Sequence, residues 1–452
     1  MNEGSLKKDF FWNTAGALSV ALSSFVLAFV SMRFLGPQDG GVFSFGFSTL
    51  GQQIFTIAYF GIRPMHITDI GGYSFEDYHG ARIKTCLLAF IVAAVWLIIL
   101  IATGSYSFYK GLCIMMLALY KIADGYADVW ECELQRIGFL YKAGKELFIR
   151  TVLAVLIYTA VCVATGSLIY SCVAAVIMQY GVIALFSRTF AGSIKESKEA
   201  LSEAGGGKLD GDGENAAAKA ATLKAAAVKT STEKTAAVTG KAVSGRQREL
   251  IRDAGFLFIS VFLDFYVFSS AKYAVDLKLG DSMSGIFNML FMPTSIIYLM
   301  ANFVMKPFMS RMAMLLNDGD TEGFKATRRK LAIGILGLTA ICVAACLILG
   351  RWALGIIELL TGDAYAGKFT ANLDVFTVII AGGGIYALAC LYYYCLVMMK
   401  KQKAVFMVYA VVAVLALIVS GPAVGYLGLM GAAAAYLFLM AMLLIGFKVL
   451  QK

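Results

Sequence analysis

Long apolar blocks, separated by short polar segments, constrain this chain more than any other feature of its sequence. Blocks such as 84–103, 331–350 and 426–447 are each about as long as a helix must be to cross ~30 Å of hydrocarbon. A membrane barrel would instead show short segments of alternating polarity. The sequence therefore predicts an all-α, polytopic membrane protein.

The charged residues support this prediction and argue against a nucleic-acid partner. Only 15% of the 452 residues are charged and 60% are hydrophobic, whereas a soluble domain carries about 25% charged residues. The net charge of +10 comes from lysines and arginines that lie mostly in the loops between apolar blocks. In that position they set topology and meet lipid headgroups.

We predict twelve membrane spans and both termini in the cytoplasm. With this count the basic clusters at 142–145, 328–330 and 400–403 all fall on one side, as the positive-inside rule requires of the cytoplasmic face. The expected location is the inner (cytoplasmic) membrane. The predicted spans are about 11–32, 42–62, 84–103, 107–130, 147–166, 168–187, 254–274, 284–305, 331–350, 373–398, 404–420 and 426–447.

Residues 192–250 differ from the rest of the chain. They are rich in Ala, Lys, Glu, Gly and Thr and contain no aromatic residue, so they cannot bury enough apolar surface to offset the cost of ordering. We predict a low-complexity cytoplasmic linker between an N-terminal lobe, 1–191 with helices 1–6, and a C-terminal lobe, 251–452 with helices 7–12. A tether is the expected role, and partner binding or regulation is the alternative.

A repeated pattern relates the two halves. The recurring pairs are Gly36 with Gly280, Gly41 with Gly285, and Arg63-Pro64 with Lys306-Pro307. The two glycines have the same spacing in each copy, and an apolar span follows them both times. Repeats of this kind in a membrane protein are typical of transporters, whose site lies where the halves meet.

The predicted fourth span carries a polar stripe. Lys121, Asp124, Asp128, Glu131 and Gln135 fall within an arc of roughly 80° on a helix that is otherwise apolar. One interpretation is an internal salt bridge between Lys121 and Asp124, with a hydrated cytoplasmic helix end. The other, which we prefer, is a stripe that lines a water-filled passage, because ionisable groups at membrane depth usually face a cavity or a partner.

Other polar residues mark the remaining candidate positions. Asp264, in the predicted seventh span, is either held by a neighbouring hydroxyl or binds a coupling cation or proton. Arg63 and Lys306 end spans 2 and 8 at the inner face, either as snorkelling anchors or as a cation pair for a phosphate head group. His66 and His79 follow span 2 and are predicted to be surface histidines.

No catalytic or cofactor motif is present in the sequence. There is no P-loop, GxSxG, HExxH or dinucleotide fingerprint, and the nine cysteines have no metal-site spacing. A membrane glycan polymerase or ligase would need a large outer loop, and the longest expected one, about 351–372, is short. We therefore expect no enzyme activity, no catalytic residue, no cofactor and no metal.

Several segments form a more specific pattern. They are Phe11-Trp12-Asn13-Thr14-Ala15-Gly16, Arg33-Phe34-Leu35-Gly36, Phe43-Ser44-Phe45, Phe60-Gly61-Ile62-Arg63 with Thr68-Asp69, Asp128-Val129-Trp130-Glu131-Cys132-Glu133-Leu134-Gln135-Arg136, Ala143-Gly144-Lys145, Phe148-Ile149-Arg150-Thr151 and Gly382-Gly383-Gly384-Ile385-Tyr386-Ala387-Leu388. Together they resemble bacterial polysaccharide flippases of the Wzx type, within the multidrug/oligosaccharidyl-lipid/polysaccharide (MOP) exporter superfamily. The resemblance implies two six-helix lobes around a central cavity. It also implies that the cargo is an undecaprenyl-pyrophosphate-linked oligosaccharide, moved to the outer leaflet by alternating access.

The sequence thus leads to one main functional hypothesis and one alternative. For a flippase we expect Arg63, Lys121 and Lys306 to bind substrate, and the expected cavity or ion-coupling carboxylates are Asp124, Asp128, Glu131 and Asp264. Expected partners are the lipid-linked oligosaccharide, membrane lipids and other biosynthesis proteins such as a glycan polymerase. The alternative is a cation-coupled multidrug or small-molecule antiporter of the same superfamily.

Overall fold

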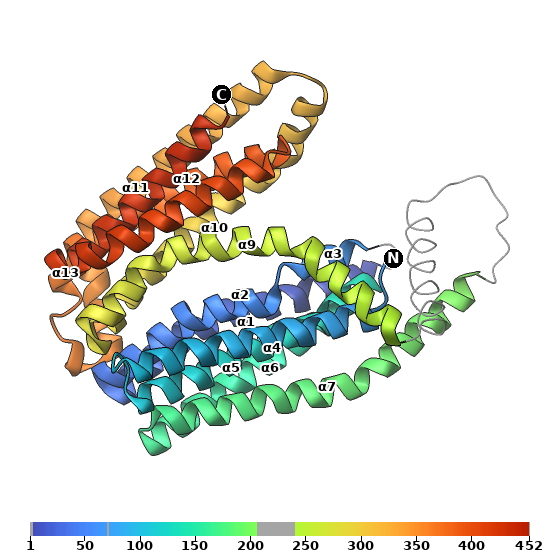
Figure 1. Cartoon of the computed structure of the whole chain (residues 1–452), viewed down its shortest axis with the longest axis horizontal. Coiled ribbons are helices and arrows are strands. Elements are labelled where there is room, and N and C mark those ends of the chain that lie inside the picture. Colours follow the sequence, from blue (N-terminus) through green and yellow to red (C-terminus); the bar gives the residue numbers. More distant parts are fainter. Residues whose placement is uncertain (1–2, 70–71, 206–239, 452) are drawn as a thin grey trace. The chain divides into compact units, whose positions relative to one another are not determined.

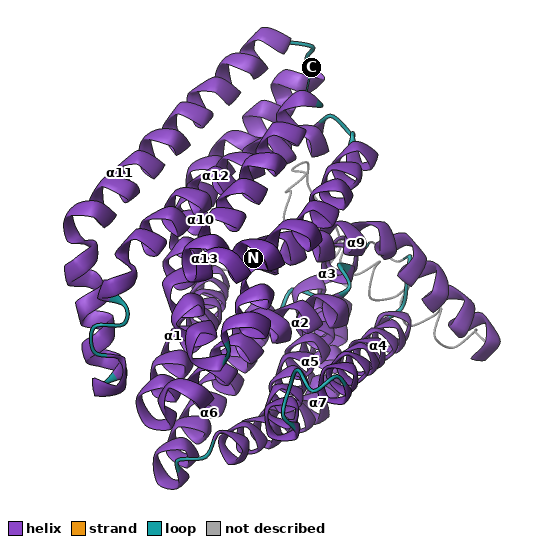
Figure 2. Ribbon diagram, turned by 60° about the vertical axis from the view of Figure 1, so that its left-hand side comes forward, coloured by secondary structure: helices purple, strands orange, loops and turns teal. Residues whose placement is uncertain are grey.

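The computed structural model describes residues 3–69, 72–205 and 240–451, and all regular secondary structure in those ranges is helical (Figures 1 and 2). The first half contains α1 (Glu3–Phe45), a π-helical turn (Gly46–Leu50), α2 (Gly51–Tyr59), α3 (Ile62–Thr68), α4 (Phe75–Ala102), α5 (Phe108–Arg136), α6 (Leu140–Thr165) and α7 (Leu168–Gly205). The second half contains α9 (Gly240–Leu279), α10 (Asp281–Asn317), α11 (Thr321–Thr361), two 3-10 turns (Asp363–Tyr365 and Thr370–Asn372), α12 (Leu373–Met398) and α13 (Gln402–Val449).

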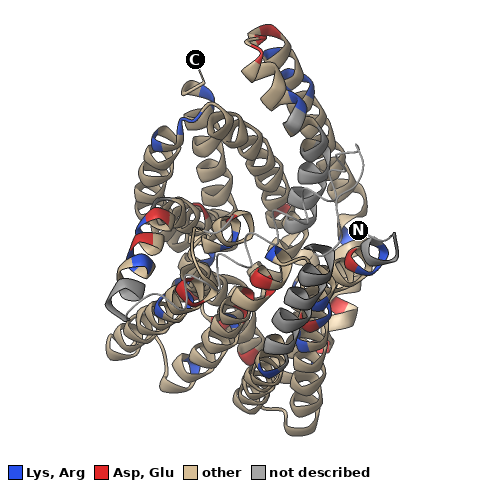
Figure 3. Cartoon of the chain, turned by 90° about the vertical axis from the view of Figure 1, so that its right-hand side faces the viewer, with Lys and Arg blue, Asp and Glu red and all other residues tan. Residues whose placement is uncertain are grey.

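Eight helical segments in the described residues are long and apolar enough to cross a membrane. Two of them, Lys7–Tyr59 and Gln402–Val449, have 53 and 48 residues and each covers two predicted spans. The helical path is broken inside both, at Gly36 and at Gly428. Figure 3 shows long helical stretches without charged residues. A polytopic, helical membrane fold is therefore confirmed, while the count of twelve spans stays a prediction.

The chain forms two compact units, which we describe separately. The first unit contains Met1–Leu27 and Leu50–Phe258, and the second contains Ala28–Thr49 and Ile259–Lys452. The two units group residues that are close in space, whereas the predicted lobes and linker are consecutive parts of the sequence. The units therefore do not test the predicted division of the chain, which stays a prediction. The ends of the predicted linker continue α7 and α9, and its middle, 206–239, lies outside the described residues.

In the first unit α5 is the central helix, because it packs against α2, α3, α4, α6 and α7. Small residues make this possible. A Cβ added to Gly125 of α5 would lie 2.8 Å from the Cβ of Ala58 in α2. A Cβ on Gly16 of α1 would similarly lie 2.8 Å from the carbonyl oxygen of Gly144 in α6. Helix backbones in membranes approach closely where side chains are small, and these contacts follow that rule.

In the second unit the two copies of the glycine repeat lie against each other. Gly36 has φ 77° and ψ −174°, and Gly280 has φ 80° and ψ 178°, a combination that is essentially restricted to glycine. A helical segment begins directly after each of them. A Cβ on Gly285 would lie 2.9 Å from the Cα of Gly41, so the second glycines of the two copies are in backbone contact. The two copies of the repeat found in the sequence therefore also pack against each other in the structure.

Further contacts tie the 28–49 segment to the rest of the second unit. Arg33 donates from Nη1 to the carbonyl oxygen of Leu359 near the end of α11, at 3.3 Å. Thr49 donates from Oγ1 to Oδ1 of Asn288 in α10, at 2.9 Å. The 28–49 segment is thus held by polar bonds as well as by the glycine contact.

Candidate functional site

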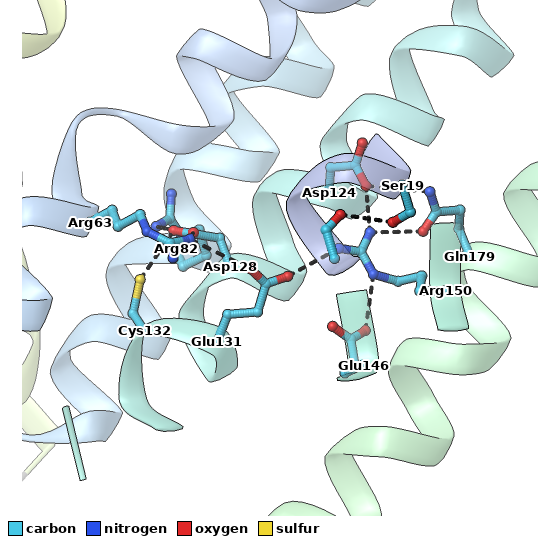
Figure 4. Close-up of polar contacts among 11 residues, drawn as sticks. Ser19, Arg63, Arg82, Asp124, Asp128, Glu131, Cys132, Glu146, Arg150 and Gln179 are labelled. Carbon is cyan, nitrogen blue, oxygen red and sulfur yellow. Dashed lines mark hydrogen bonds and ion pairs between the residues drawn. The ribbon is translucent and has the colours of Figure 1, made fainter. Parts of the chain in front are cut away.

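The polar stripe of α5 meets cations from other helices inside the first unit (Figure 4). Arg63 comes from α3, Arg82 from α4 and Arg150 from α6. The helical period places the stripe residues on one side of α5, and the neighbouring helices supply the partners. Figure 4 shows the resulting network, in which guanidinium and carboxylate groups alternate.

Arg150 is buried and fully surrounded by acceptors. Its Nε donates to Glu146 Oε1 at 2.9 Å, and its Nη2 donates to Glu131 Oε1 at 3.1 Å. Its Nη1 contacts Asp124 Oδ1 and donates to Gln179 Oε1 of α7 at 2.8 Å. Only 1% of the Arg150 side chain is exposed. A planar guanidinium has five N–H donors in a fixed fork and can bind several acceptors at once, so this residue joins α5, α6 and α7.

Asp128 binds two arginines on the opposite side of the stripe. Its Oδ1 accepts from Arg63 Nη1, and its Oδ2 accepts from Arg82 Nη2 at 2.6 Å. Arg82 also donates to the carbonyl oxygens of Ala58 and Tyr59, at 2.9 and 2.7 Å. These carbonyls end α2, where a helix leaves acceptors unpaired, so Arg82 both caps α2 and holds Asp128.

Glu131 connects the two arginine centres. Its Oε1 accepts from Arg150, and its Oε2 lies 3.5 Å from Arg63 Nη1. Arg63 also donates from Nη2 to Gln135 at 3.4 Å. With 31% of its side chain exposed, Arg63 is the most accessible of the three arginines, since Arg82 and Arg150 are almost completely buried. Charges placed in a low-dielectric interior must be paired, and this network pairs them across four helices.

Solved structures with the same arrangement of helices align over nearly the whole chain. The eukaryotic MATE transporter AtDTX14 superposes with a TM-score of 0.59 at 9% identity, over 99% of this chain and 96% of its own. An inward-facing multidrug resistance MATE family transporter of the MOP superfamily gives 0.58 at 10% identity, over 95% and 93%. An outward-facing one gives 0.51 at 9% identity, over 98% and 94%. The chain has a MATE-type transporter fold.

The solved structures that share this fold are transporters. At 9–10% identity the likeness establishes the fold alone. No family model matches the sequence, and no curated protein matches it significantly.

Within the MATE-type fold, the predicted site residues fall into three groups. Arg63, Asp124, Asp128 and Glu131 are brought together in the network of the first unit. Lys121 is buried on the same helix, one turn before Asp124, whose partner in the network is Arg150.

The other two predicted residues lie elsewhere. Asp264 belongs to the second unit, where Tyr386 of α12 donates from Oη to Asp264 Oδ2 at 2.9 Å. Lys306 is part of α10, but its side chain lies outside what the structure describes. Binding and coupling roles for all seven residues stay predictions.

The prediction that His66 is a surface histidine is wrong. Its side chain is completely buried, stacks on the Tyr78 ring with centroids 3.9 Å apart, and contacts Glu133 Oε2 through Nε2 at 2.9 Å. Arg136 donates to the other oxygen of Glu133 at 2.7 Å. Burial lowers the pKa of His66, although its bond to Glu133 opposes this shift. The loop after span 2 thus folds back as α3 against α5 and buries the ring.

The sequence-based prediction missed Arg82, Glu146, Arg150 and Gln179. A charge argument indicates that such partners must exist, because the stripe itself holds three carboxylates and only one cation, Lys121. Glu146 and Arg150 also have the i,i+4 spacing of a helical ion pair. No local pattern identifies Arg82, whose role depends on where α2 ends in space.

Proposed function

We propose that this protein is a MOP-superfamily flippase that moves an undecaprenyl-pyrophosphate-linked oligosaccharide across the cytoplasmic membrane, for the synthesis of a cell-surface polysaccharide. Translocation would proceed by alternating access, with both termini in the cytoplasm. The MATE-type fold supports the transporter class. The Wzx-like segments and the charges inside the membrane helices support the choice of cargo.

The proposal rests mainly on the observation that the α5 carboxylates are paired with arginines. Asp124, Asp128 and Glu131 each contact an arginine guanidinium. A carrier for cationic drugs needs carboxylates that attract the cargo, whereas these are already compensated by arginines. Lys121 adds a further buried cation in the same helix. Such a balance favours an anionic cargo, because a pyrophosphate entering a low-dielectric passage requires cations.

Arg63 is the residue we assign to first contact with the pyrophosphate. Its guanidinium is partly exposed, and its donors are shared between Asp128, Glu131 and Gln135. A phosphate can compete for these donors with the two-pronged geometry that arginine prefers. Lys121, one turn before Asp124 on α5, would bind the phosphate next, as a point charge. Lys306 would take the position equivalent to Arg63 in the second copy of the repeat.

The test is glycan export in cells that lack the chromosomal copy and carry variants on a plasmid. We expect Arg63→Gln and Lys121→Gln to reduce surface glycan strongly, with lipid-linked sugar accumulating in the inner leaflet. Membrane levels of each variant must equal those of the wild type. Lys325→Gln is the matched control, because Lys325 is exposed and pairs only with its neighbour Glu322 in the described structure. Normal export by the Arg63/Lys121 double variant would overturn the assignment.

Asp264 favours a second candidate, the cation-coupled small-molecule antiporter. This partly buried carboxylate receives its hydrogen bond from a tyrosine hydroxyl, so its charge is not compensated through that contact. The antiporter hypothesis predicts that cells with the protein survive cationic drugs better than cells without it, and that Asp264→Asn removes the difference. Equal drug sensitivity with and without the protein would eliminate this candidate.

A further inference from the structure

Two basic clusters that are far apart in the sequence meet at one end of the second unit. One lies near the start of α11, and the other forms the turn between α12 and α13. Arg328 of the first cluster donates to Oε1 of Gln451, and Lys401 of the second donates to the carbonyl oxygen of Leu450 at 2.8 Å. Both clusters therefore bind the same short stretch that follows α13. This is the end of the unit that we predict to be cytoplasmic.

The surface around this junction is basic and poor in acid. The carboxylates nearest along the chain belong to the turn before α11, where Asp320 caps the helix and Glu322 pairs with Lys325. Five cations at this end are exposed and have no ion-pair partner among the residues that the structure describes. These five, which we call the basic patch, are Arg329, Lys330, Lys400, Lys403 and Lys448. Because like charges gathered at one end of a unit repel, an anionic partner would stabilise them.

Lys400 occupies a backbone position that is typical of glycine. Its φ is 58°, in the left-handed region. The backbone N–H groups of Lys400 and Lys401 donate to the carbonyl oxygens of Val397 and Leu396, both at 2.9 Å, and so end α12. Helices commonly end in such a turn, with glycine in the left-handed position because it has no Cβ. A lysine there strains the backbone, which points to a use for its side chain beyond the turn itself.

Apolar side chains continue from the basic patch along two helices. Ile333 and Leu336 follow the first cluster in α11, and Met407 and Val411 follow the second in α13. All four side chains are more than half exposed. A water-soluble anion needs only the cations, whereas a phospholipid combines a phosphate with acyl chains. The combination of cations at the helix ends and apolar side chains beside them therefore favours a lipid.

We propose that the basic patch binds the headgroup of an anionic phospholipid from the cytoplasmic leaflet, with its acyl chains along the exposed apolar side chains of α11 and α13. Arg329 can hold a phosphate through two donors, and the lysines act as point charges. A lipid bound here joins the ends of α11, α12 and α13 from outside, in addition to the contacts of Arg328 and Lys401. No residue of this site belongs to the first unit, so the proposal is independent of the cargo and of the α5 network.

Thermal unfolding of the purified full-length protein in nanodiscs tests the site. Phosphatidylcholine nanodiscs are compared with nanodiscs that also contain phosphatidylglycerol. We expect the anionic lipid to raise the melting temperature of the wild type. A patch variant should show less than about half of that shift, since each cation near an anionic surface contributes separately. Its substitutions are Arg329→Gln, Lys330→Gln, Lys400→Gln and Lys403→Gln.

The matched control removes the same charge from exposed positions of the first unit. Its substitutions are Lys8→Gln, Lys84→Gln, Lys145→Gln and Arg248→Gln. The control should keep the whole shift. Both variants retain Arg328 and Lys401, so the contacts to the stretch after α13 stay intact. Absence of the shift in the wild type, or an equal shift in the patch and control variants, would overturn the lipid site.

Lys400→Gly separates lipid binding from folding. Glycine relieves the strained backbone, so we expect this variant to melt above the wild type in phosphatidylcholine. Because the variant also lacks one cation of the patch, the shift caused by phosphatidylglycerol should be smaller. A variant that melts below the wild type in phosphatidylcholine, or that keeps the whole shift, would show that Lys400 serves the turn and not a lipid.

The soluble headgroup identifies the class of anion. Native mass spectrometry should find phosphatidylglycerol retained by the wild type and by the control variant, and lost from the patch variant. Glycerophosphoglycerol, which is the same headgroup without acyl chains, should leave the melting temperature unchanged at an equal concentration. If it raised the melting temperature as much as the lipid does, then the patch would bind water-soluble anions and the lipid proposal would be refuted.

Discussion

Asp128 in the first unit and Asp264 in the second are both carboxylates on long helices, yet their partners differ in kind. Asp128 accepts from two guanidinium groups that come from α3 and α4. Asp264 accepts from the hydroxyl of Tyr386. The paired charges around Asp128 require several helices to be correctly positioned together, because unpaired charges are costly in a low-dielectric interior. The hydroxyl partner of Asp264 requires only one partner helix to be positioned. The first unit has thus been built around fixed charges.

The same contrast holds for the cations. Arg150 is surrounded by carboxylates, while Lys272 in the second unit lies over aromatic rings, 4.6 Å from the centroid of Phe291 and 5.7 Å from that of Phe268. Backbone contacts provide cohesion in the second unit, where the two repeat copies meet at Gly41 and Gly285. Close glycine contacts occur in both units, so the comparison teaches that the network of paired charges is what distinguishes the first unit.

Removal of Arg150 should have the largest effect, because it would leave three carboxylates around an empty position. We expect Arg150→Met to destabilise the protein by about 3–5 kcal/mol, the usual cost of breaking a buried ion pair. Thermal unfolding in detergent would measure it. Arg252→Met is the control, with a side chain that is 74% exposed, and should change stability by less than about 0.5 kcal/mol. A small effect at Arg150 would remove the distinction between the units.

Filling the glycine contact tests the second unit in the same way. A Cβ on Gly285 would lie 2.9 Å from the backbone of Gly41, so Gly285→Ala forces the two copies apart. We expect a loss of about 1–3 kcal/mol, the range for overpacking. Gly334→Ala is the control, because a Cβ there meets nothing within 4 Å and alanine is the better helix former. Equal stabilities for the two variants would contradict the packing argument.

A smaller effect is expected for the polar contact in the second unit. Tyr386→Phe removes the hydroxyl that donates to Asp264 and keeps the ring. A neutral hydrogen bond contributes about 0.5–1.5 kcal/mol, so we expect a loss within this range in chemical unfolding experiments. If the loss approached that of Arg150→Met, then the second unit would depend on its polar groups as much as the first.

The smallest effect concerns acid and His66. Because burial lowers the pKa of this ring in the folded protein, the unfolded chain binds a proton more readily. The stability from the neutral ring is therefore complete above its ordinary pKa of about 6.5 and is lost as the pH falls below that value. We expect the melting temperature of His66→Gln to fall less than that of the wild type between about pH 7.5 and about pH 5.5. A steeper fall in the variant would show that the ring is charged when folded.

The features that the sequence predicted correctly are local. The helical fold follows from apolar length, and the stripe from Lys121 to Gln135 lies on one side of α5 because helical periodicity alone places it there. The glycine repeat was also visible, and both copies have the backbone conformation that only glycine adopts. These properties depend on a residue and its close neighbours along the chain.

The partners within the site depend on distant parts of the chain. Arg82 meets Asp128 because α4 packs against α5 at the point where α2 ends, and His66 is buried because α3 folds onto α5. Spacing along the sequence does not specify such meetings.

By itself, then, the sequence determined that this is a helical membrane protein with an internal repeat and a charged stripe on one helix, since period and apolar length are encoded residue by residue. Only the tertiary structure decided that Arg150 joins Glu131 to Glu146, and that Gly41 lies against Gly285. The physical reason is that pairing energies inside a membrane protein act between helices, and the helix that supplies the partner is chosen by packing.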